Sequence, residues 1–412
     1  MNKNKYNHGV LLSCGQLRVS RRKNEIHIRN SVYSVVILLL LFALLSCDGA
    51  PELEEEAATW EEARPLKEIY QSYFLMGNII SPSDLNNNAT AATRFGYLKR
   101  HYNTLTAENH MKPDNIAPRN KPATDTWTYQ WTNADNIVKA AQDAGMNVVG
   151  HTLIWHSQTP AWLTTGTPAE VEANLNKYVT EVVTHFKGKV IAWDVVNEAM
   201  KDGLTSGDSS GDKWTNCLRG SETSNGSRWN AAIGSEYIEK AFLAARRADP
   251  DVKLYYNDYS LNTTAKRMAV YNMVKAINTK YPNVEGRPLI DGIGMQSHHH
   301  RGTDPQTVDA SIKKFAELGV EIAISELDIL TTGSLVTPAP AWNEDDIKYQ
   351  AGRYALMFQV FKNNAANISR VTFWGIDDAT SWRKNYYPTL LDKDYNLKPA
   401  FYAVTNPDRY LP

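Results

Sequence analysis

Two glutamates at the ends of apolar runs are the side chains best suited to chemistry in this sequence. Glu198 closes the run WDVVNE, and Glu326 lies in the run ISELD. Two carboxyl groups about 5 to 5.5 Å apart can cut a glycosidic bond with retention of configuration, because one donates a proton while the other attacks the sugar. A single Glu at a strand end is more easily explained by an ion pair with a loop Lys or Arg, so the hypothesis depends on the pair.

The surroundings of the two glutamates predict which of them donates the proton. A Glu side chain has an ordinary pKa of about 4.3. A proton donor therefore needs apolar or like-charged surroundings, and a nucleophile needs hydrogen-bond donors. Glu326 has a candidate donor in His298 on the neighbouring predicted strand, whereas Glu198 has no obvious cationic neighbour along the sequence. We expect Glu198 to be the acid/base and Glu326 to be the nucleophile.

The elements that must position these groups follow a regular alternation. From Tyr73 onward, short apolar runs alternate with longer segments of helical period, which favours parallel strands joined by helices. The predicted strands are 73–80, 103–108, 147–155, 190–198, 253–258, 290–298, 321–328 and 368–376. Among the predicted helices are 168–186, 234–247, 305–318 and 345–361. The expected fold class is α/β: a closed (β/α)8 TIM barrel, forming a single catalytic domain over 66–412, with reactive groups at the carboxyl ends of the strands.

Composition excludes several classes of partner. The chain has 412 residues, of which 42% are hydrophobic and 22% charged, and its formal net charge is -1. These values are ordinary for a globular protein with a large core. Nucleic-acid binders carry a basic field, which is absent, so no nucleic-acid partner is expected. No spacing of Cys and His resembles a zinc site, and we expect neither a metal nor a cofactor.

The N-terminal segment differs chemically from the rest of the chain. Basic residues between Lys3 and Arg29 precede the apolar run 35–45. That run is too short to span a bilayer but has the length of a signal-peptide core. It ends in the sequence LLSC, which resembles a bacterial lipobox and predicts lipidation of Cys47. The alternative is an ordinary signal peptide that happens to contain a cysteine.

These features predict how the chain is divided and where it is anchored. Residues 1–46 would be a lipoprotein signal peptide, and residues 47–65 an acidic tether. The expected location is the outer membrane of the cell envelope, on its periplasmic or its outer face, with membrane contact through the lipid only. Cys217 would have no partner, so no internal disulfide is predicted. We expect a monomer.

The motifs at the predicted strand ends together resemble glycoside hydrolase family 10, the xylanase family, from about Leu66 to Leu411. The motifs are ENHMK at 108–112, GHTLIWH at 150–156, NE at 197–198 and SELD at 325–328, in the family's order along the chain. The resemblance implies a retaining endo-1,4-β-xylanase acting on xylan or xylo-oligosaccharides. It also implies that Glu198 is the acid/base and Glu326 the nucleophile.

The resemblance further implies which other residues support the reaction. His298 would be bonded to the nucleophile and oriented by Asp328. Asn257 and Tyr259 would lie near the acid/base on the leaving-group side. The remaining positions expected to bind substrate are Glu108, Asn109, Lys112, His151, Trp155, Asn197, Gln296, Trp374 and Trp382. These residue types suit sugars, because pyranose faces stack on Trp while their hydroxyl groups bond Asn, Gln and Glu.

Two other functions remain open at this point. A related retaining β-glycanase, such as a β-glucanase or a mannanase, would share both glutamates. Lys112 and the two covering tryptophans favour xylan, since a C6 hydroxymethyl group should meet steric resistance there. A non-catalytic surface glycan-binding lipoprotein would keep the barrel without the chemistry. The loop 201–228 would either shape the leaving-group subsites or be a tolerated surface insertion.

Overall fold

Parallel strands form the centre of the described chain. The computed structural model describes residues 58–209, 211–221, 225–335 and 341–411. The predicted signal peptide, Cys47 and the tether as far as residue 57 lie outside these ranges. The described strands are β1 Leu75–Ile80, β2 Thr104–Ala107, β3 Asn147–Trp155, β4 Ala192–Asn197, β5 Lys253–Asp258, β6 Gly292–Met295, β7 His298–His300, β8 Glu321–Leu330 and β9 Ile368–Phe373.

The strands close into a barrel. Each neighbouring pair runs parallel, in the order β6-β5-β4-β3-β2-β1-β9-β8, and β6 pairs again with β8. β7 adds to the end of β8. All eight predicted strands are therefore present, and the predicted (β/α)8 barrel is confirmed. Such a barrel gathers the carboxyl ends of its strands at one face.

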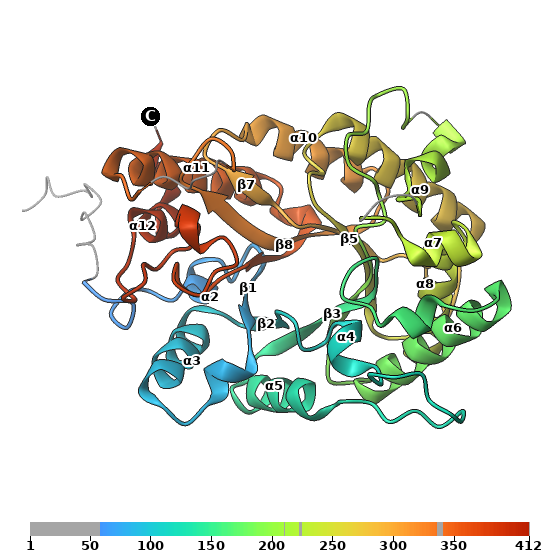
Figure 1. Cartoon of the computed structure of the whole chain (residues 1–412). Coiled ribbons are helices and arrows are strands. Elements are labelled where there is room, and N and C mark those ends of the chain that lie inside the picture. The colour runs from blue at the N-terminus through green and yellow to red at the C-terminus, as the bar shows by residue number, and fades with distance from the viewer. Residues whose placement is uncertain (1–57, 210, 222–224, 336–340, 412) are drawn as a thin grey trace, which may run out of the picture. The chain divides into compact units, whose positions relative to one another are not determined.

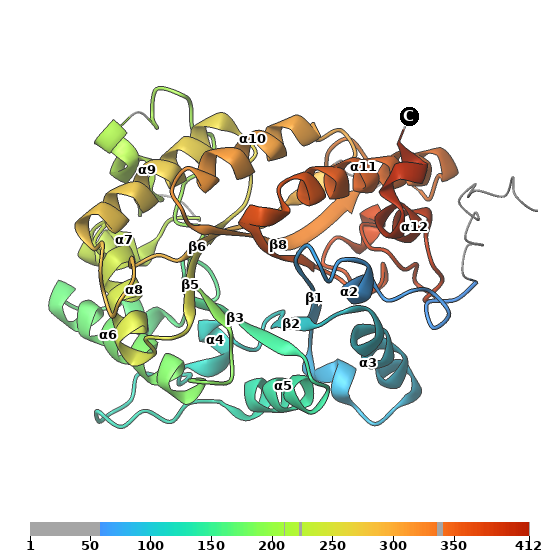
Figure 2. The same ribbon diagram turned by 180° about the vertical axis from the view of Figure 1, so that it is seen from behind.

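Helices surround the ring of strands in both views of the molecule (Figures 1 and 2). The α-helices are α2 Leu66–Ile69, α3 Ala89–His101, α4 Pro113–Ile116, α5 Thr132–Asp143, α6 Pro168–His185, α7 Arg228–Ile233, α8 Tyr237–Ala248, α9 Thr264–Lys280, α10 Pro305–Ala316, α11 Glu344–Asn363 and α12 Pro399–Thr405. Short 3-10 helices are η1 Pro82–Leu85, η2 Ala161–Thr164, η3 Gly211–Cys217, η4 Ala365–Asn367, η5 Lys384–Tyr386 and η6 Pro407–Tyr410. No helix in the described ranges has the length and apolar character needed to cross a membrane.

The predicted helix starts depend on local capping. The Thr167 hydroxyl accepts a hydrogen bond from the Glu170 amide at 3.3 Å, and the Glu170 carboxylate accepts one from the Thr167 amide at 2.8 Å. With Pro168 in the first turn, this capping box begins α6 where the sequence predicts it. Asp304 caps α10 in the same way through the amide of Gln306. The four predicted helices end within three residues of their observed bounds.

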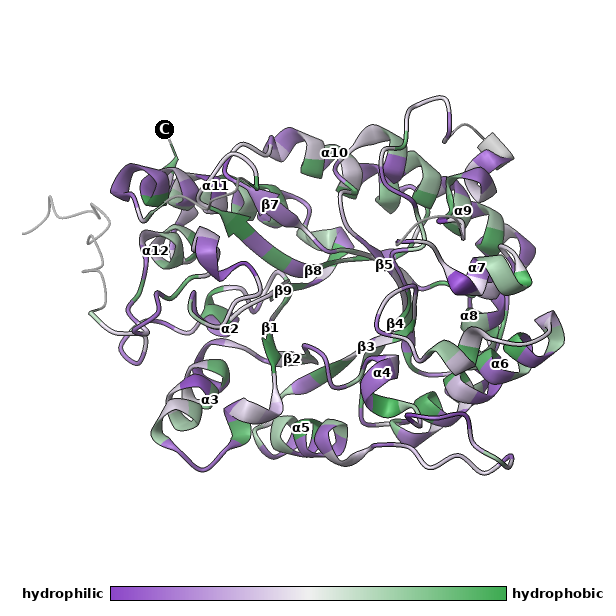
Figure 3. Ribbon diagram, in the orientation of Figure 1, coloured by the Kyte–Doolittle hydropathy of each residue, from purple (hydrophilic) through white to green (hydrophobic). Residues whose placement is uncertain are grey.

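Strand burial explains the apolar runs. Every residue of β4 is buried, as are those of β2. In Figure 3, green stretches appear on β1, β4 and β8, whereas β7 is purple and purple residues recur along the helices. Trp193 of β4 is fully buried. A Cβ atom at Gly150 of β3 would lie 2.2 Å from the Trp193 ring, so only glycine fits beside it. Close packing of this kind fixes the strand ends on which the functional side chains stand.

The strand predicted over 290–298 is wrong in its extent. β6 ends at Met295, and the chain breaks before β7 because Ser297 adopts a left-handed conformation with φ of 61°. After this break β7 pairs further along β8, which sets His298 opposite Asp328. The interruption thus brings together two residues that the site requires.

The tether predicted over 47–65 extends too far toward the barrel. Trp60 packs edge-on against Tyr97 with ring centroids 5.9 Å apart, and its carbonyl lies 2.8 Å from Nε2 of His101. Ala63 is buried, and its carbonyl accepts a hydrogen bond from Arg100 at 3.0 Å. The chain is therefore part of the barrel domain from Trp60 onward, because an indole half-buried against α3 does not belong to a free linker.

Candidate active site

A cavity of about 510 Å³ opens where the strands end. The predicted residues that line it are Glu108, Asn109, Lys112, His151, Trp155, Asn197, Glu198, Tyr259, Gln296, His298, Glu326, Trp374 and Trp382. Both candidate carboxyl groups thus face one cavity, Glu198 after β4 and Glu326 within β8. Of the predicted site residues in the described chain, Asn257 and Asp328 stand behind this lining.

Glu326 is a buried carboxylate surrounded by donors. Its side chain is 6% exposed. Oε1 accepts a hydrogen bond from Nδ2 of Asn257 at 2.8 Å, and Oε2 lies 3.2 Å from Nε2 of His298. Burial acts to raise the pKa of Glu326, but the bond from His298, the charges of His151 and His298 and the bond from Asn257 outweigh it. The net pKa is lowered, so Glu326 is ionised at neutral pH.

His298 owes its charge to Asp328. Nδ1 of His298 lies 3.0 Å from the Asp328 carboxylate, while Nε2 faces Glu326. Burial acts to lower the pKa of His298, yet the two carboxylates raise it to about 9, with Asp328 the stronger. The imidazole is therefore protonated at neutral pH and donates to both carboxylates. His298 thus contacts Glu326 on one side and Asp328 on the other.

Asp328 is itself held from the other side. Trp382 donates from Nε1 to Oδ2 at 2.9 Å, and Arg383 donates to Oδ1 at 3.1 Å. Both partners lie in the segment after β9. The Trp382 ring also meets His298 edge-on, with ring centroids 4.9 Å apart. The buried Asp328 carboxylate thus contacts both the charged His298 and Trp382, which lines the cavity.

Glu198 has the opposite environment. Its carboxyl group accepts hydrogen bonds from Nε2 of Gln296 at 2.8 Å and from Nε1 of Trp155 at 2.9 Å, both uncharged donors. Burial raises its pKa, nearby carboxylates at Asp258 and Glu326 raise it further, and the two bonds do not reverse the shift. Glu198 therefore holds its proton to a higher pH than an ordinary glutamate.

His156 lies beside the Glu198 carboxyl group but adds no charge to it. Nδ1 of His156 lies 3.9 Å from the Glu198 carboxyl group. Burial, assisted by the charge of Arg219, lowers the pKa of His156 to about 4. His156 is therefore neutral at neutral pH and supplies no charge that would ionise Glu198.

Amide side chains connect the two carboxyl groups. Nε2 of Gln296 donates to Glu198 and also to Oδ1 of Asn197, at 3.2 Å. The same Asn197 oxygen accepts from Nδ2 of Asn257 at 3.0 Å, and that nitrogen donates to Glu326. A continuous series of hydrogen bonds thus fixes the separation of the carboxyl groups.

The expected contact of Asn257 with substrate is corrected by its position. Asn257 is fully buried and donates to Asn197 and Glu326, while its own Oδ1 accepts from the Ser325 hydroxyl at 2.6 Å. Its amide also occupies the space beside Gly294, where a Cβ atom would lie 2.2 Å from it. With its polar atoms engaged behind the cavity, Asn257 positions the carboxylate.

The residues after β2 form one side of the cavity. Lys112 donates to Oδ1 of Asn109 at 2.9 Å, and its ammonium lies 5.0 Å from the centroid of the Trp155 ring. Burial lowers the pKa of Lys112 against the pull of three glutamates, whereas burial raises that of Glu108 against the pull of Lys112. Sugar hydroxyl groups would meet both donors and acceptors on this side.

Aromatic rings cover the cavity above the carboxyl groups. Trp374 is nearly buried and meets His151 edge-on at 5.2 Å, while Trp382 is 55% exposed. Nδ1 of His151 lies 3.0 Å from the Asp194 carboxylate, which fixes that ring. Tyr259 follows β5 and also lines the cavity. An exposed indole beside a fixed one is a suitable surface for a sugar face.

Sequence reasoning missed several residues of the site. Gln158, Ser260 and Arg383 also line the cavity. Gln158 lies just beyond the GHTLIWH motif and Arg383 is adjacent to Trp382, so proximity to a motif could have indicated them. Arg219, which reaches the site from the loop 201–228, gave no signal in a segment rich in Gly, Ser and Asp.

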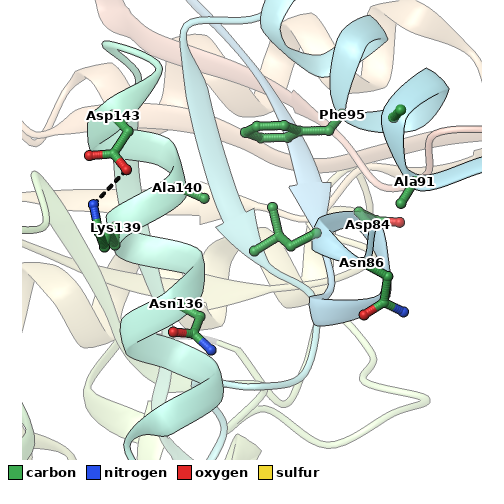
Figure 4. A pocket seen from close by; sticks show the side chains of 10 residues that line it. Asp84, Asn86, Ala91, Phe95, Asn136, Lys139, Ala140 and Asp143 are labelled. Carbon is green, nitrogen blue, oxygen red and sulfur yellow. Dashed lines mark hydrogen bonds and ion pairs between the residues drawn. The ribbon is translucent and has the colours of Figure 1, made fainter. Parts of the chain in front are cut away.

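A second hollow of about 390 Å³ lies between α5 and the segment from η1 to α3 (Figure 4). Its Lys139 is paired with Asp143 of the same helix at 2.7 Å, and Ala91 and Phe95 line it on the α3 side. We assign no chemistry to it. Within the described ranges, no group of three or more His, Cys, Asp or Glu side chains is arranged to hold a metal ion.

Comparison with known proteins agrees with this geometry. The family model described as Glycosyl hydrolase family 10 matches residues 65–407. A beta-1,4-xylanase of Dictyoglomus thermophilum is 37% identical over 389 residues, covering 91% of this chain and 99% of the relative. An endo-1,4-beta-xylanase A of Thermotoga neapolitana is 37% identical over 367 residues, covering 87% of this chain but only 32% of that longer relative.

Solved structures agree as well. A family 10 xylanase with a bacterial Ig-like domain, from termite gut, superimposes with a TM-score of 0.75 at 36% identity, covering 86% of this chain and 80% of that one. The second structure is a mutant of the intracellular xylanase of Thermoanaerobacterium saccharolyticum, solved with xylotriose. It superimposes with a TM-score of 0.70 at 34% identity, covering 83% of this chain and 98% of that chain.

Barrel and cavity together define a glycosidase with two carboxyl groups of opposite protonation. The chain belongs to glycosyl hydrolase family 10.

The charge on His298 predicts a change in pH dependence. In Asp328→Asn, His298 loses its stronger anionic partner, so its pKa falls from about 9 and its support for ionised Glu326 weakens. Removing a nearby cation raises a carboxylate pKa. The acid limb of kcat/KM should therefore move upward by roughly one pH unit. A Trp382→Phe control removes a hydrogen bond from Asp328 without removing charge and should leave that limb in place. An unmoved limb in Asp328→Asn would contradict the role of His298.

Proposed function

We infer that this chain is a retaining endo-1,4-β-xylanase that cuts β-1,4-xylosidic bonds by double displacement and so contributes to breakdown of plant cell wall xylan. The observation that carries this conclusion is the contrast between two carboxyl groups facing one cavity. Glu326 is held ionised by His298, whereas Glu198 is buried among uncharged donors with its pKa raised. One carboxylate and one carboxylic acid are what the first step of the reaction needs.

In the first step, Glu326 attacks the anomeric carbon of the xylose to the non-reducing side of the bond. The bond from that carbon to the linking oxygen breaks, and Glu198 donates its proton to the departing oxygen. Asn257 and His298 hold the attacking carboxylate in place, which lowers the entropic part of the barrier.

In the second step, Glu198 acts as a base. It takes a proton from a water molecule whose oxygen attacks the same carbon, and Glu326 departs as a carboxylate. Loss of the charge on the substrate-linked Glu326 removes one of the influences that raise the pKa of Glu198, which suits the donor for its second role. The product keeps the original configuration after two inversions.

The cavity suits cleavage inside a polymer. Glu108, Asn109 and Lys112 follow β2, whereas Tyr259 follows β5, three strands further around the ring. The two carboxyl groups stand between these sides, so xylose units can bind on both sides of the scissile bond. Trp374 and Trp382 cover the reacting sugar. Together with Lys112 they favour a pentose, because the C6 hydroxymethyl group of a hexose would collide with these side chains.

Replacing each glutamate by alanine should separate the two roles. Glu326→Ala should lose essentially all turnover on every xyloside, because no covalent intermediate can form. Glu198→Ala should fall by roughly 10²- to 10⁴-fold on xylan, which needs protonation of the leaving group. It should keep the first step on aryl xylobiosides with good leaving groups, where azide restores turnover. Steady-state kinetics on both substrate types would check this. If azide failed to restore Glu198→Ala, the assignment would be wrong.

We propose separately that the enzyme is a lipoprotein of the cell envelope, anchored through Cys47. The support is chemical: a basic segment, an apolar run and the sequence LLSC precede a stretch rich in glutamate. The barrel of the described chain begins at Trp60, so about a dozen residues would separate it from the membrane surface.

The anchor has a direct test. Cys47→Ser should shift the enzyme from the membrane fraction to the soluble fraction and abolish incorporation of labelled fatty acid, without change in kcat on soluble xylo-oligosaccharides. Cys217 is buried and free, so Cys217→Ser is the matched control and should stay in the membrane fraction. Membrane retention of Cys47→Ser would contradict the proposal.

A further inference from the structure

Arg219 is a buried cation in the loop 201–228. It lies between η3 and α7, and only 4% of its surface is exposed, whereas several residues between Lys201 and Asp208 are open to solvent. The backbone on both sides of it is tied down. Its own amide donates to the carbonyl of Ala199 at 2.9 Å, and its carbonyl accepts from the Asn230 side chain at 2.9 Å.

The guanidinium bridges the acid/base and the rim of the cavity. Nε donates to the backbone carbonyl of Glu198 at 2.8 Å, and one terminal nitrogen donates to the Tyr259 hydroxyl at 2.5 Å. The other terminal nitrogen lies 3.4 Å from the Asp202 carboxylate and 3.4 Å from the carbonyl of Asn225. A planar fork with several donors suits contacts in different directions from one centre.

The contact with Glu198 falls on a strained stretch of backbone. Glu198 has φ of 56°, in the left-handed region that residues with a side chain rarely adopt. Such a conformation persists only where the surroundings hold it. The amides are held from β5, since Glu198 donates to the carbonyl of Asn257 at 2.8 Å and Ala199 to the Tyr256 hydroxyl at 3.1 Å. Arg219 holds the carbonyl side.

The second contact of Arg219 is with Tyr259, which lines the cavity after β5. The Tyr259 hydroxyl also donates to Asp202. On the ring, the Lys266 ammonium lies 3.5 Å from the centroid and is itself paired with Asp258 at 2.7 Å. The ring is thus fixed at its hydroxyl by Arg219 and Asp202, and on its face by Lys266.

We propose that Arg219 is a positioning residue for proton donation: it fixes the backbone of Glu198 and the ring of Tyr259 in one geometry, so that the acid points at the oxygen of a leaving group bound beside Tyr259. The guanidinium bonds the carbonyl and leaves the carboxyl group to Gln296 and Trp155. The loop 201–228 is then a support of the catalytic acid. This inference depends on the proposed function, because it takes Glu198 to be the acid.

The test compares two substrates in the full-length enzyme. Xylohexaose needs a proton at the departing oxygen, whereas an aryl xylobioside with a dinitrophenolate leaving group does not. In Arg219→Gln, kcat/KM for xylohexaose should fall about 100-fold, the scale expected for a misplaced catalytic group, while kcat/KM for the aryl substrate should change less than about threefold. Arg219→Lys keeps one donor for the Glu198 carbonyl and should fall in between.

A matched control separates positioning from folding. Arg246 is also fully buried and bonds the carbonyl of Val252 at 2.8 Å and the Asp291 carboxylate, before the first residues of β5 and β6, away from the cavity. Arg246→Gln should lower the melting temperature and leave the ratio of the two kcat/KM values unchanged.

Each outcome is decisive. Equal losses on both substrates in Arg219→Gln, or an unchanged ratio in both Arg219 variants, would overturn the proposal and leave Arg219 as an anchor of the loop. Failure of the proposed function looks different, because Glu198→Ala would then fail to separate the two substrates in the same assay.

Discussion

A carboxylate that is removed from water yet must stay ionised is the constraint on which this site depends. Burial acts to raise the pKa of Glu326, since desolvation penalises the charged form. The protein counters this with a protonated His298 and an amide from Asn257. Asp328, on the other side of His298, is the stronger of the two carboxylates that keep His298 charged. Loss of Asp328 would therefore weaken the ionisation of Glu326, although Asp328 does not line the cavity.

Several features of the fold follow from that chain of contacts. The strand breaks at Ser297, and beyond this break β7 pairs with β8 so that His298 lies opposite Asp328. Asp328 takes hydrogen bonds from Trp382 and Arg383, so the loop after β9 is tied to the same carboxylate. On the opposite side of the barrel, Glu198 is surrounded by neutral donors and a neutral His156. The pKa values of Glu326 and Glu198 are thus shifted in opposite directions because the side chains around them differ in charge.

The sequence was sufficient for the barrel and for the two carboxyl groups, because both leave local signals. Glu198 directly follows the apolar run of β4, Glu326 lies within the apolar run of β8, and the cap at Thr167 marks a helix start. Other features come from tertiary contacts that no local pattern encodes. The left-handed Ser297 interrupts a run whose residue types give no sign of a break. Asn257 turns inward to Glu326, whereas the family resemblance implied a contact with substrate. Trp60 lies in an acidic stretch whose composition predicted a tether, yet it packs against Tyr97. Arg219 connects its loop to Glu198 after β4 and to Tyr259 after β5.

The claim that Glu326 is the nucleophile can be tested by trapping the covalent intermediate. A 2-deoxy-2-fluoro-xylobioside with a dinitrophenolate leaving group should inactivate the enzyme. The fluorine slows both steps, whereas the good leaving group speeds only the first, so the covalent intermediate accumulates. Peptide mapping by mass spectrometry should then find one fluoroxylobiosyl group per chain, on the peptide that contains Glu326 and on that residue. A label on Glu198, or inactivation without any covalent label, would contradict the assignment.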